Sequence, residues 1–323
     1  MQLERTLSSL GFSETHIVDG LPSISNLFTP QKRCGVYVLE FADGEVYAGQ
    51  AIDVCRRFGQ HRKNFDDIVK LTFQRVTPDK LNKVEKITIQ SLEKEGFHLR
   101  NIVHTSVTYT ASPFDEIMIP EVQKTWLNDL SYIDGDGERN DDADLRRKYT
   151  RRYQEISQLP YFKEFIQILR IYVQRCIPAF KRSEMYYWCC TCLLEKRPDD
   201  VLVYSRINLY RQEVFTIGTE KGIPFFSWHL ANSPLQASHN RFQVFRKSLF
   251  NTYDTTLYNH VYKPGGQDQT NLYSRGSISN AFNLLENAQV LNAIRLFNLR
   301  SMQKGANWYY RNHCFDLADK LLQ

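Results

Sequence analysis

The chain lacks any long apolar run, any strong excess of one charge, and the closely spaced, even set of cysteines that marks a disulfide-rich protein. A membrane-spanning helix needs ~20 consecutive apolar residues, so we expect none. Residues 1–25 contain no apolar core and carry acidic side chains early, which is unlike a secretory signal. The seven cysteines are spread thinly over 323 residues, which favours reduced thiols and a cytoplasmic protein.

The net charge of +5, from 41 basic and 36 acidic side chains, is too small to demand a nucleic-acid partner. Local clusters of charge are more informative. Residues 56–63, RRFGQHRK, contain four basic side chains and a histidine with no acid among them. The chain is also long enough for two domains, because single cores stop growing near ~250–300 residues.

A change in the sign of the charge marks the boundary that we expect between these domains. Residues 134–144 contain six acids and one arginine, and five basic side chains follow by residue 152. Such a stretch, with two glycines and few apolar residues, predicts an exposed connector. The expected organisation is an N-terminal extension at 1–29, a first domain at 30–133, the connector at 134–152 and an α+β domain at 153–323.

Residues 35–49, GVYVLEFADGEVYAG, predict a β-hairpin that turns at an Asp-Gly pair. A two-residue loop would place Tyr37 and Tyr47 on opposite faces of the sheet. A three-residue loop, with Gly44 in the left-handed conformation, pairs Leu39 with Tyr47 and brings both tyrosines to one face. If the two phenols cooperate, the loop therefore has three residues.

A helix is expected next, over residues 54–64. Asp53 is a suitable N-cap, and an apolar pair four residues apart supports the helical period. Arg57 and His61 are also four residues apart, so they lie on one face of this helix. They fall at the margin of its buried stripe, where we expect the lip of a cleft.

A third strand and a second helix complete the first hundred residues. Residues 68–76 alternate like a strand, and residues 77–96 form a helix that begins with Thr-Pro and ends at glycine. Glu85 falls inside the apolar stripe of this helix. A carboxylate there is costly unless a cation or a hydrogen-bond donor accompanies it.

This order of residues resembles the GIY-YIG nuclease family. The two tripeptides of the family correspond to Gly35-Val36-Tyr37 and Tyr47-Ala48-Gly49, with mild departures at the central positions. The residues that match the rest of the family pattern are, in chain order, Arg57, His61, Glu85 and Asn101. The resemblance covers about residues 30–105. It implies a small three-stranded antiparallel sheet flanked by helices.

The resemblance also implies hydrolysis of phosphodiester bonds with one divalent cation, Mg²⁺ or Mn²⁺, held by Glu85 in each active site. Tyr37 or Tyr47 would activate water while the other orients it, and the sequence does not order them. A phenol has a pKa near ~10, so as a base it needs the positive charge of Arg57 and of the cation. Arg57 would grip the scissile phosphate, and His61 would share the base role or bind phosphate.

The expected partner is DNA, as a duplex. Arg56, Arg62 and Lys63 are expected to bind its backbone. Asn101 is grouped with these substrate-binding residues, where it would hold the architecture or a water molecule. Because one active site cuts one strand, a double-strand break would need a homodimer or two visits.

The expected function is that of a metal-dependent DNA endonuclease of the restriction or phage-defence type. Taken singly, each residue named above would be an ordinary strand or helix side chain; their order and spacing favour a site. Two alternatives stay open: a structure-selective repair or recombination nuclease, and a non-catalytic nucleic-acid-binding protein. RNA also stays open as a substrate.

The rest of the chain carries no family pattern that we identify. Residues 106–133 predict an extra strand and a short helix from Pro120 that pack onto the first domain. A helix at 161–177, four short strands and then further helices predict the α+β class for the second domain. Three cysteines at 189, 190 and 192 alternate like a buried strand, which favours core thiols over zinc ligands. Residues 300–313 mix basic and aromatic side chains, a composition that suits base stacking but is more often core.

Overall fold

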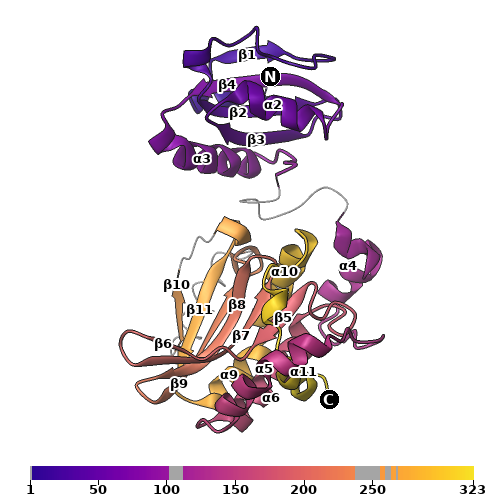
Figure 1. Cartoon of the computed structure of the whole chain (residues 1–323), viewed down its shortest axis with the longest axis vertical. Coiled ribbons are helices and arrows are strands. Elements are labelled where there is room, and N and C mark those ends of the chain that lie inside the picture. The colour runs from indigo at the N-terminus through magenta and orange to yellow at the C-terminus, as the bar shows by residue number, and fades with distance from the viewer. Residues whose placement is uncertain (1, 102–111, 237–254, 259–262, 267) are drawn as a thin grey trace. The chain divides into compact units, whose positions relative to one another are not determined.

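A computed structural model of the chain describes residues 2–101, 112–236, 255–258, 263–266 and 268–323. The chain forms two units, Met1–Thr110 and Ala111–Gln323, each with its own antiparallel sheet and its own helices (Figure 1). The α+β class predicted from the sequence is therefore confirmed. None of the described helices is long and apolar enough to cross a membrane.

The sheet of the first unit contains four described strands rather than the three that the sequence predicts. In spatial order they are β1 (Glu14–Ile17), β4 (Ile68–Arg75), β2 (Gly35–Phe41) and β3 (Val46–Ala51). The extra strand, β1, pairs with β4. Its sequence ETHI contains a single large apolar residue, so alternation of apolar and polar residues gives no signal for it.

Residues 1–29 are part of the first unit and not an extension to it. Besides β1 they form helix α1 (Gln2–Ser9), and Leu7 and Phe28 are buried in its two hydrophobic clusters. This N-terminal segment therefore supplies the fourth strand of the sheet and part of the buried core of the first unit.

The register of the first hairpin is set by a three-residue loop between β2 and β3. Leu39 lies opposite Tyr47. The loop closes where Phe41 N donates to Glu45 O at 3.0 Å, and Gly44, with φ of +85°, takes the left-handed conformation. Of the two loop lengths that the sequence allows, the three-residue loop, which brings both tyrosines to one face, is the one observed.

Helices cover both faces of this sheet. On one face lies α2 (Val54–Arg62), which begins at the predicted cap, Asp53; its carboxylate accepts a hydrogen bond from Arg56 N at 3.0 Å. On the other face, α3 (Leu81–Lys94) follows a 3₁₀ turn at Pro78–Lys80 and runs along β3 (Figure 1). The sheet residues buried on the α2 face are Tyr37, Leu39, Phe41, Leu71 and Phe73, and those on the α3 face are Val36, Val38, Val46 and Ala48.

Arg100 fastens the tip of the hairpin to the sheet. Its side chain is 11% exposed and donates to Asp43 at 2.6 Å, Glu45 at 2.7 Å and Asp67 at 2.7 Å. The guanidinium carbon also lies 3.7 Å from the centroid of the Phe41 ring. Three carboxylates and an aromatic face therefore converge on one cation.

The second unit is built on a seven-stranded sheet. The spatial order is β10-β11-β9-β8-β7-β5, with β6 also paired to β7. The strands are β5 (Trp188–Thr191), β6 (Glu195–Arg197), β7 (Val201–Leu209), β8 (Gln212–Glu220), β9 (Ile223–Leu230), β10 (Thr255–Tyr258) and β11 (Thr270–Arg275). The four strands predicted from the sequence are β5, β7, β8 and β9.

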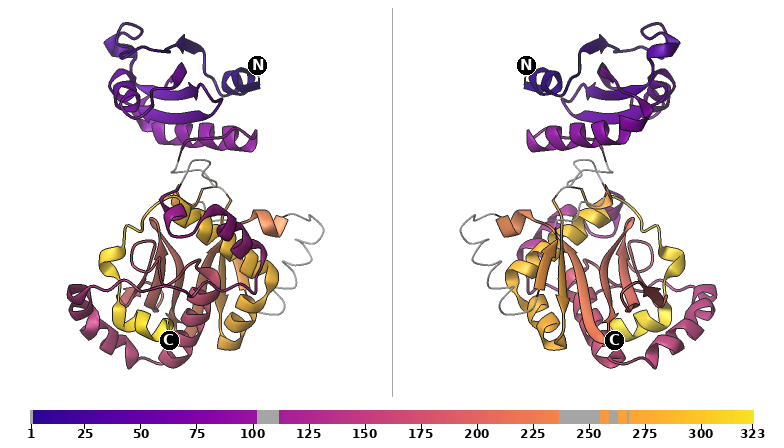
Figure 2. Two further views of the ribbon diagram at one scale, coloured as in Figure 1. Left: turned by 90° about the vertical axis from the view of Figure 1, so that its right-hand side faces the viewer. Right: turned by 90° about the vertical axis from the view of Figure 1, so that its left-hand side faces the viewer.

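Helices pack against this sheet (Figure 2). They are α4 (Pro120–Asn128), α5 (Ala143–Ser157), α6 (Phe162–Cys176), α7 (Ser233–Gln236), α9 (Ile278–Glu286), α10 (Ala288–Gln303) and α11 (Phe315–Leu321). From α6, the predicted core helix, Phe165 and Tyr172 lie against Phe226 and Phe215, with ring centroids 5.7 and 4.6 Å apart. All seven cysteines are free thiols, and the three at 189, 190 and 192 are buried, as predicted.

The charged segment at 134–152 lies within the second unit instead of connecting two domains. Asp142 caps α5 by accepting hydrogen bonds from two backbone N–H groups. Arg139 donates to both carboxylate oxygens of the buried Glu184, at 2.7 and 2.8 Å. The boundary between the two units lies between Thr110 and Ala111. The acids and bases of the 134–152 segment form a helix cap and ion pairs that hold this segment against the core of the second unit.

Helix α4 was predicted at Pro120 and is present, but it belongs to the second unit. Trp126 is fully buried in the core of that unit, and its carbonyl accepts a hydrogen bond from Arg295 Nη1 at 2.6 Å. The strand expected shortly after residue 106 falls in residues 102–111, which lie outside the described part of the chain.

Replacing Arg100 tests the fastening of the hairpin. We expect Arg100→Ala to lower the free energy of unfolding of the first unit by ~2 kcal/mol, because three carboxylates lose a largely buried cation. Amide hydrogen exchange in β2 and β3 of the full chain measures this change. The matched control is Arg75→Ala, an exposed arginine on β4; equal effects of the two substitutions would contradict the assignment.

Candidate active site

Two tyrosines from adjacent strands face each other in the first unit. Tyr37 lies on β2 opposite Gly49, and Tyr47 lies on β3. Their rings are stacked, with centroids 6.3 Å apart and planes 26° apart. The shared face predicted from the loop length is therefore observed, with Tyr37 almost fully buried and Tyr47 half-buried.

The glycines beside the tyrosines leave room for this approach. A Cβ atom on Gly49 would lie 2.6 Å from Tyr37 Oη and 2.8 Å from Tyr47 Cε1, closer than such atoms come in proteins. At Gly35 a Cβ would overlap the carbonyl oxygen of Gln74 on β4. Each glycine thus permits a contact that any larger residue would prevent.

His61 brings α2 into contact with the tyrosine pair. Tyr37 Oη and His61 Nε2 are 2.8 Å apart, and the ring of Tyr47 lies 4.6 Å from the imidazole, centroid to centroid. The imidazole is 7% exposed. The cap at the start of α2 and the packing of Phe58 against the sheet hold this histidine over β2.

Arg57, one turn before His61, supplies positive charge to both phenols. Burial raises the pKa of Tyr37 and of Tyr47, while hydrogen bonding and charge from Arg57 lower it in part. The net direction is upward for both phenols, so the charge of Arg57 by itself does not offset the effect of burial. Burial and the charge of Arg57 together lower the pKa of His61 to about 4.

These protonation states define the hydrogen bond at the centre of the cluster. At neutral pH the imidazole of His61 is uncharged and the phenol of Tyr37 keeps its proton. The Tyr37 hydroxyl donates to His61 Nε2 in the tautomer that carries its proton on Nδ1. Transfer of the phenol proton to the imidazole would give a buried phenolate–imidazolium pair, which the raised pKa of Tyr37 and the lowered pKa of His61 both oppose.

Glu85 approaches the tyrosines from the opposite side of the sheet. It lies on α3, which packs along the edge strand β3, and its half-buried carboxylate accepts a hydrogen bond from Gln50 Nε2 at 3.0 Å. Gln50 Nε2 also donates to Asn82 Oδ1 at 2.7 Å. The negative charge of Glu85 contributes to the raised pKa of Tyr37 and Tyr47, so it acts on both phenols across the strand edge.

The groups around Glu85 fit a hard divalent cation. The Glu85 carboxylate and the side-chain oxygen of Asn82, which both accept hydrogen bonds from Gln50 Nε2, offer oxygen donors of the kind that Mg²⁺ and Mn²⁺ prefer. Mg²⁺ is commonly held by one or two carboxylates and completes its shell with water and substrate phosphate. The described residues contain no cluster of three His, Cys, Asp or Glu side chains of the type that holds a metal alone.

A groove of about 360 Å³ lies between the end of β3 and the outer side of α2. Its lining residues are Gln50, Ala51, Ile52, Asp53, Arg56, Arg57 and Gln60. Gln50 touches the Glu85 carboxylate, and Arg57 acts on both phenols, so the groove joins the two halves of the cluster. Its two arginines suit an anionic ligand.

The predicted substrate-binding residues divide into two groups. Arg56 and Lys63 are exposed, and Arg56 lines the groove. Arg62 instead donates to three backbone carbonyl groups, including Val18 O at 2.6 Å, and ties the end of α2 to the sheet. Asn101 is buried, and its amide bonds both the N–H and the carbonyl of Ala48, at 2.9 and 2.6 Å.

Arg62 and Asn101 therefore have architectural contacts, and of the two roles weighed for Asn101 the structure gives it that of holding the fold. The sequence does not identify Gln50 or Asn82 as hydrogen-bonding neighbours of Glu85. Asn82 precedes Glu85 by three residues on one helix, and this spacing places the two side chains on the same face. Gln50 directly follows the second tripeptide, but nothing in its sequence surroundings identifies a partner on a later helix.

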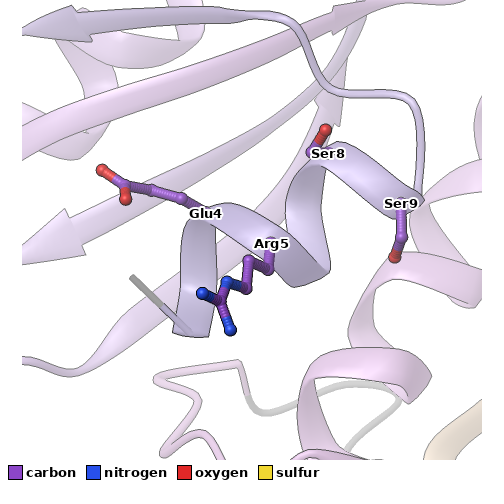
Figure 3. Close-up of a pocket in the computed structure, with 4 residues that line it drawn as sticks. All are labelled: Glu4, Arg5, Ser8 and Ser9. Carbon is purple, nitrogen blue, oxygen red and sulfur yellow. The ribbon is translucent and has the colours of Figure 1, made fainter.

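A second hollow, of about 540 Å³, lies on α1 and is lined by Glu4, Arg5, Ser8 and Ser9 (Figure 3). The charged ends of Glu4 and Arg5 point in different directions there. None of the tyrosine, histidine or Arg57 side chains lines it. The convergence at Tyr37 is the stronger candidate because groups of different chemistry meet there.

Comparison of the chain with models of protein families, with curated proteins and with solved structures finds no match of any of the three kinds.

Substituting two glycines tests the packing of the tyrosine pair. We expect Gly49→Ala to lower the free energy of unfolding of the first unit by ~1–3 kcal/mol, because the new methyl group overlaps both phenols. Gly59→Ala is the matched control: no atom lies within 4 Å of its Cβ position, and alanine favours the helix by ~0.5–1 kcal/mol. Hydrogen exchange in the first unit compares the two variants, and a change of the same sign in both would contradict this packing.

The lowered pKa of His61 predicts a pH dependence of stability. An unfolded histidine titrates near ~6.5, whereas His61 in the folded unit titrates at about 4. Between these values the unfolded state binds more protons, so stability is present above the higher value and falls as the pH drops toward the lower one. Hydrogen exchange at a series of pH values should show this fall, with a smaller slope for His61→Gln. Equal slopes would show that His61 is not the titrating group.

Proposed function

We propose that the first unit is the catalytic part of a metal-dependent DNA endonuclease. The observation that carries this proposal is the convergence of Tyr37, Tyr47 and His61 around the charge of Arg57, with Glu85 beside them across the strand edge. Four separate elements, β2, β3, α2 and α3, supply these groups. A packed core needs no such collection of phenols, imidazole and guanidinium.

The resemblance to the GIY-YIG family supports the same proposal. The proposal takes β2, β3 and β4 as the three strands that the family leads one to expect, within a sheet that has a fourth described strand, β1, at its edge. The family pattern places its arginine on the next helix and its glutamate on a later one, and here these residues lie on α2 and α3. The order of the residues and the arrangement in space are independent observations, and they favour the same assignment.

Tyr37 and His61 form the acid–base pair of the proposed mechanism. A phenolate at Tyr37 is disfavoured because burial raises the pKa of the phenol. If Tyr37 passes its proton to His61 Nε2 while it takes one from the attacking water, no phenolate accumulates. A bound phosphate opposes the charge of Arg57 and so makes the imidazole a better proton acceptor. The geometry favours Tyr37 over Tyr47 as the group that activates water, and Tyr47 would orient that water.

Arg57 and the groove bind the substrate in this mechanism. The exposed guanidiniums of Arg56 and Arg57 would contact successive phosphates along the groove, and the planar fork of Arg57 suits the scissile group. Glu85, with the side-chain oxygen of Asn82, would hold the divalent cation. When bound, that cation supplies charge to stabilise the developing negative charge on the phosphate and on the leaving oxygen.

DNA is the proposed substrate, and a restriction-like or phage-defence role is the proposed setting. Cleavage of branched against linear duplex distinguishes this role from that of a structure-selective repair nuclease. Cleavage of an RNA duplex of the same sequence tests whether the enzyme distinguishes DNA from RNA. One site cuts one strand, so double-strand cleavage would depend on a homodimer or on two visits.

Nicking of supercoiled plasmid DNA tests the proposal. We expect the wild-type chain to nick the plasmid with Mg²⁺ or Mn²⁺ and to be inactive in EDTA. Tyr37→Phe, Arg57→Ala and Glu85→Gln should each lower the rate by about 10²-fold or more, since each removes a group that acts in the transition state. Circular dichroism checks that the variants fold.

Glu93→Gln is the matched control for Glu85→Gln, since it removes the same charge from the same helix two turns further on. It should cleave like the wild type. Full activity in Glu85→Gln, or equal losses in both glutamate variants, would contradict the proposed site. DNA binding without nicking under every metal condition would favour the non-catalytic alternative.

A further inference from the structure

An exposed tryptophan lies on the surface of the second unit, in a stretch that the sequence favours as core. Trp308 is 63% exposed, whereas the other three tryptophans, at 126, 188 and 228, are fully buried. Trp308 belongs to the connection between α10 and α11, which runs along the outside of the unit (Figure 2). Exposing a large ring costs hydrophobic free energy, so its position needs an explanation.

The backbone around Trp308 is fixed by hydrogen bonds to other elements. Trp308 N donates to Tyr210 O at 2.7 Å, and the N–H of the preceding residue, Asn307, donates to Tyr186 O at 2.7 Å. On the far side, Tyr149 Oη from α5 donates to Arg311 O at 3.0 Å. The ring is therefore held out from the surface by a rigid segment and does not hang from a loose one.

A basic side chain stacks on the indole, and other aromatic and basic residues adjoin Trp308 in the chain or through backbone hydrogen bonds. Arg211, at the turn between β7 and β8, places its guanidinium carbon 3.4 Å from the centroid of the Trp308 ring. Because the guanidinium covers one face of the ring, the exposed area lies on the opposite face and the edges. Tyr310, 36% exposed, accepts a hydrogen bond from Arg311 Nε, and Tyr186 is 50% exposed. We call the side chains of Tyr186, Arg211, Trp308, Tyr310 and Arg311 the Trp308 surface.

The charge of this surface is positive. Among the described residues, neither Arg211 nor Arg311 forms an ion pair with a carboxylate. Lys148 on α5 reaches the same surface, since its Nζ lies 3.4 Å from Arg311 O. Planar rings with an open face, flanked by cations, are the combination that binds single-stranded nucleic acid.

We propose that the Trp308 surface binds unpaired nucleotides, with a base stacked on the indole and phosphates held by Arg211, Arg311 and Lys148. Bases in a duplex are stacked on one another and present no free face, so the surface discriminates for single-stranded segments. The inference goes beyond the proposed nuclease site and does not depend on it, because binding in the second unit requires neither metal nor cleavage.

Tryptophan fluorescence of the full chain in EDTA tests this proposal. Of the four tryptophans only Trp308 is exposed to solvent, so acrylamide should quench the fluorescence of Trp308 alone. An added oligothymidylate, long enough to span a site of ~4–16 nucleotides, should quench the same part of the emission. We expect Trp308→Ala to weaken binding about tenfold and Trp308→Phe, which keeps a ring, to weaken it much less. Oligouridylate is the second probe. Binding of either oligonucleotide that weakens in Trp308→Ala supports the proposal, and the one that binds more tightly shows whether the surface prefers DNA or RNA.

Charge and specificity are tested in the same assay. Lys148→Ala should weaken binding and reduce the dependence on salt, whereas Lys196→Ala, which removes an exposed lysine on β6, should not. Glu85→Gln should bind normally, which separates failure of this surface from failure of the nuclease proposal. Oligonucleotide binding that is unchanged in Trp308→Ala would overturn the proposal. So would a surface that binds polyglutamate through Trp308 but does not bind oligonucleotides.

Discussion

Gly44 takes the left-handed turn that gives the β2–β3 loop its third residue, and the candidate site depends on the register that results. With that register Tyr37 and Tyr47 share the face covered by α2, where His61 can reach the first phenol. A loop shorter by one residue would turn one tyrosine toward α3 and separate the pair. Arg100 secures the loop from outside, so a distant ion-pair cluster supports the geometry of the phenols.

The cluster has the electrostatic character of a site that works with a bound anion. Without substrate, burial keeps the phenols protonated, and burial with Arg57 keeps His61 neutral. A phosphate in the groove would offset the charge of Arg57 and shift the balance toward proton transfer. Glu85 stands across the edge of β3 and meets Gln50 rather than the phenols directly. This arrangement separates the carboxylate from the Tyr37–His61 hydrogen bond.

The parts of this architecture that local chemistry specifies could be predicted. The hairpin and the Asp53 cap follow from short-range rules. Short-range rules leave the loop at two or three residues, and α3 begins at Leu81 after a 3₁₀ turn rather than at the Thr-Pro step. Strand β1 could not be predicted, because its residues are mostly polar and its strand conformation depends on pairing with β4. The charged segment before α5 was misassigned because its composition matches that of a connector, and only the tertiary partner Glu184 reveals its role. Arg62 lies in a basic cluster that predicts a contact with DNA, yet its guanidinium donates hydrogen bonds to three backbone carbonyl groups of the first unit.

The central claim is that a metal and two phenols meet at one place in the first unit. An anomalous difference map from crystals of the full chain grown with Mn²⁺ tests it most directly. The account predicts a peak beside the Glu85 carboxylate, within reach of a water molecule that also contacts a tyrosine hydroxyl, and a hydrogen bond between Tyr37 Oη and His61 Nε2. A peak confined to other acidic residues, or a Tyr37 ring turned away from His61, would contradict it.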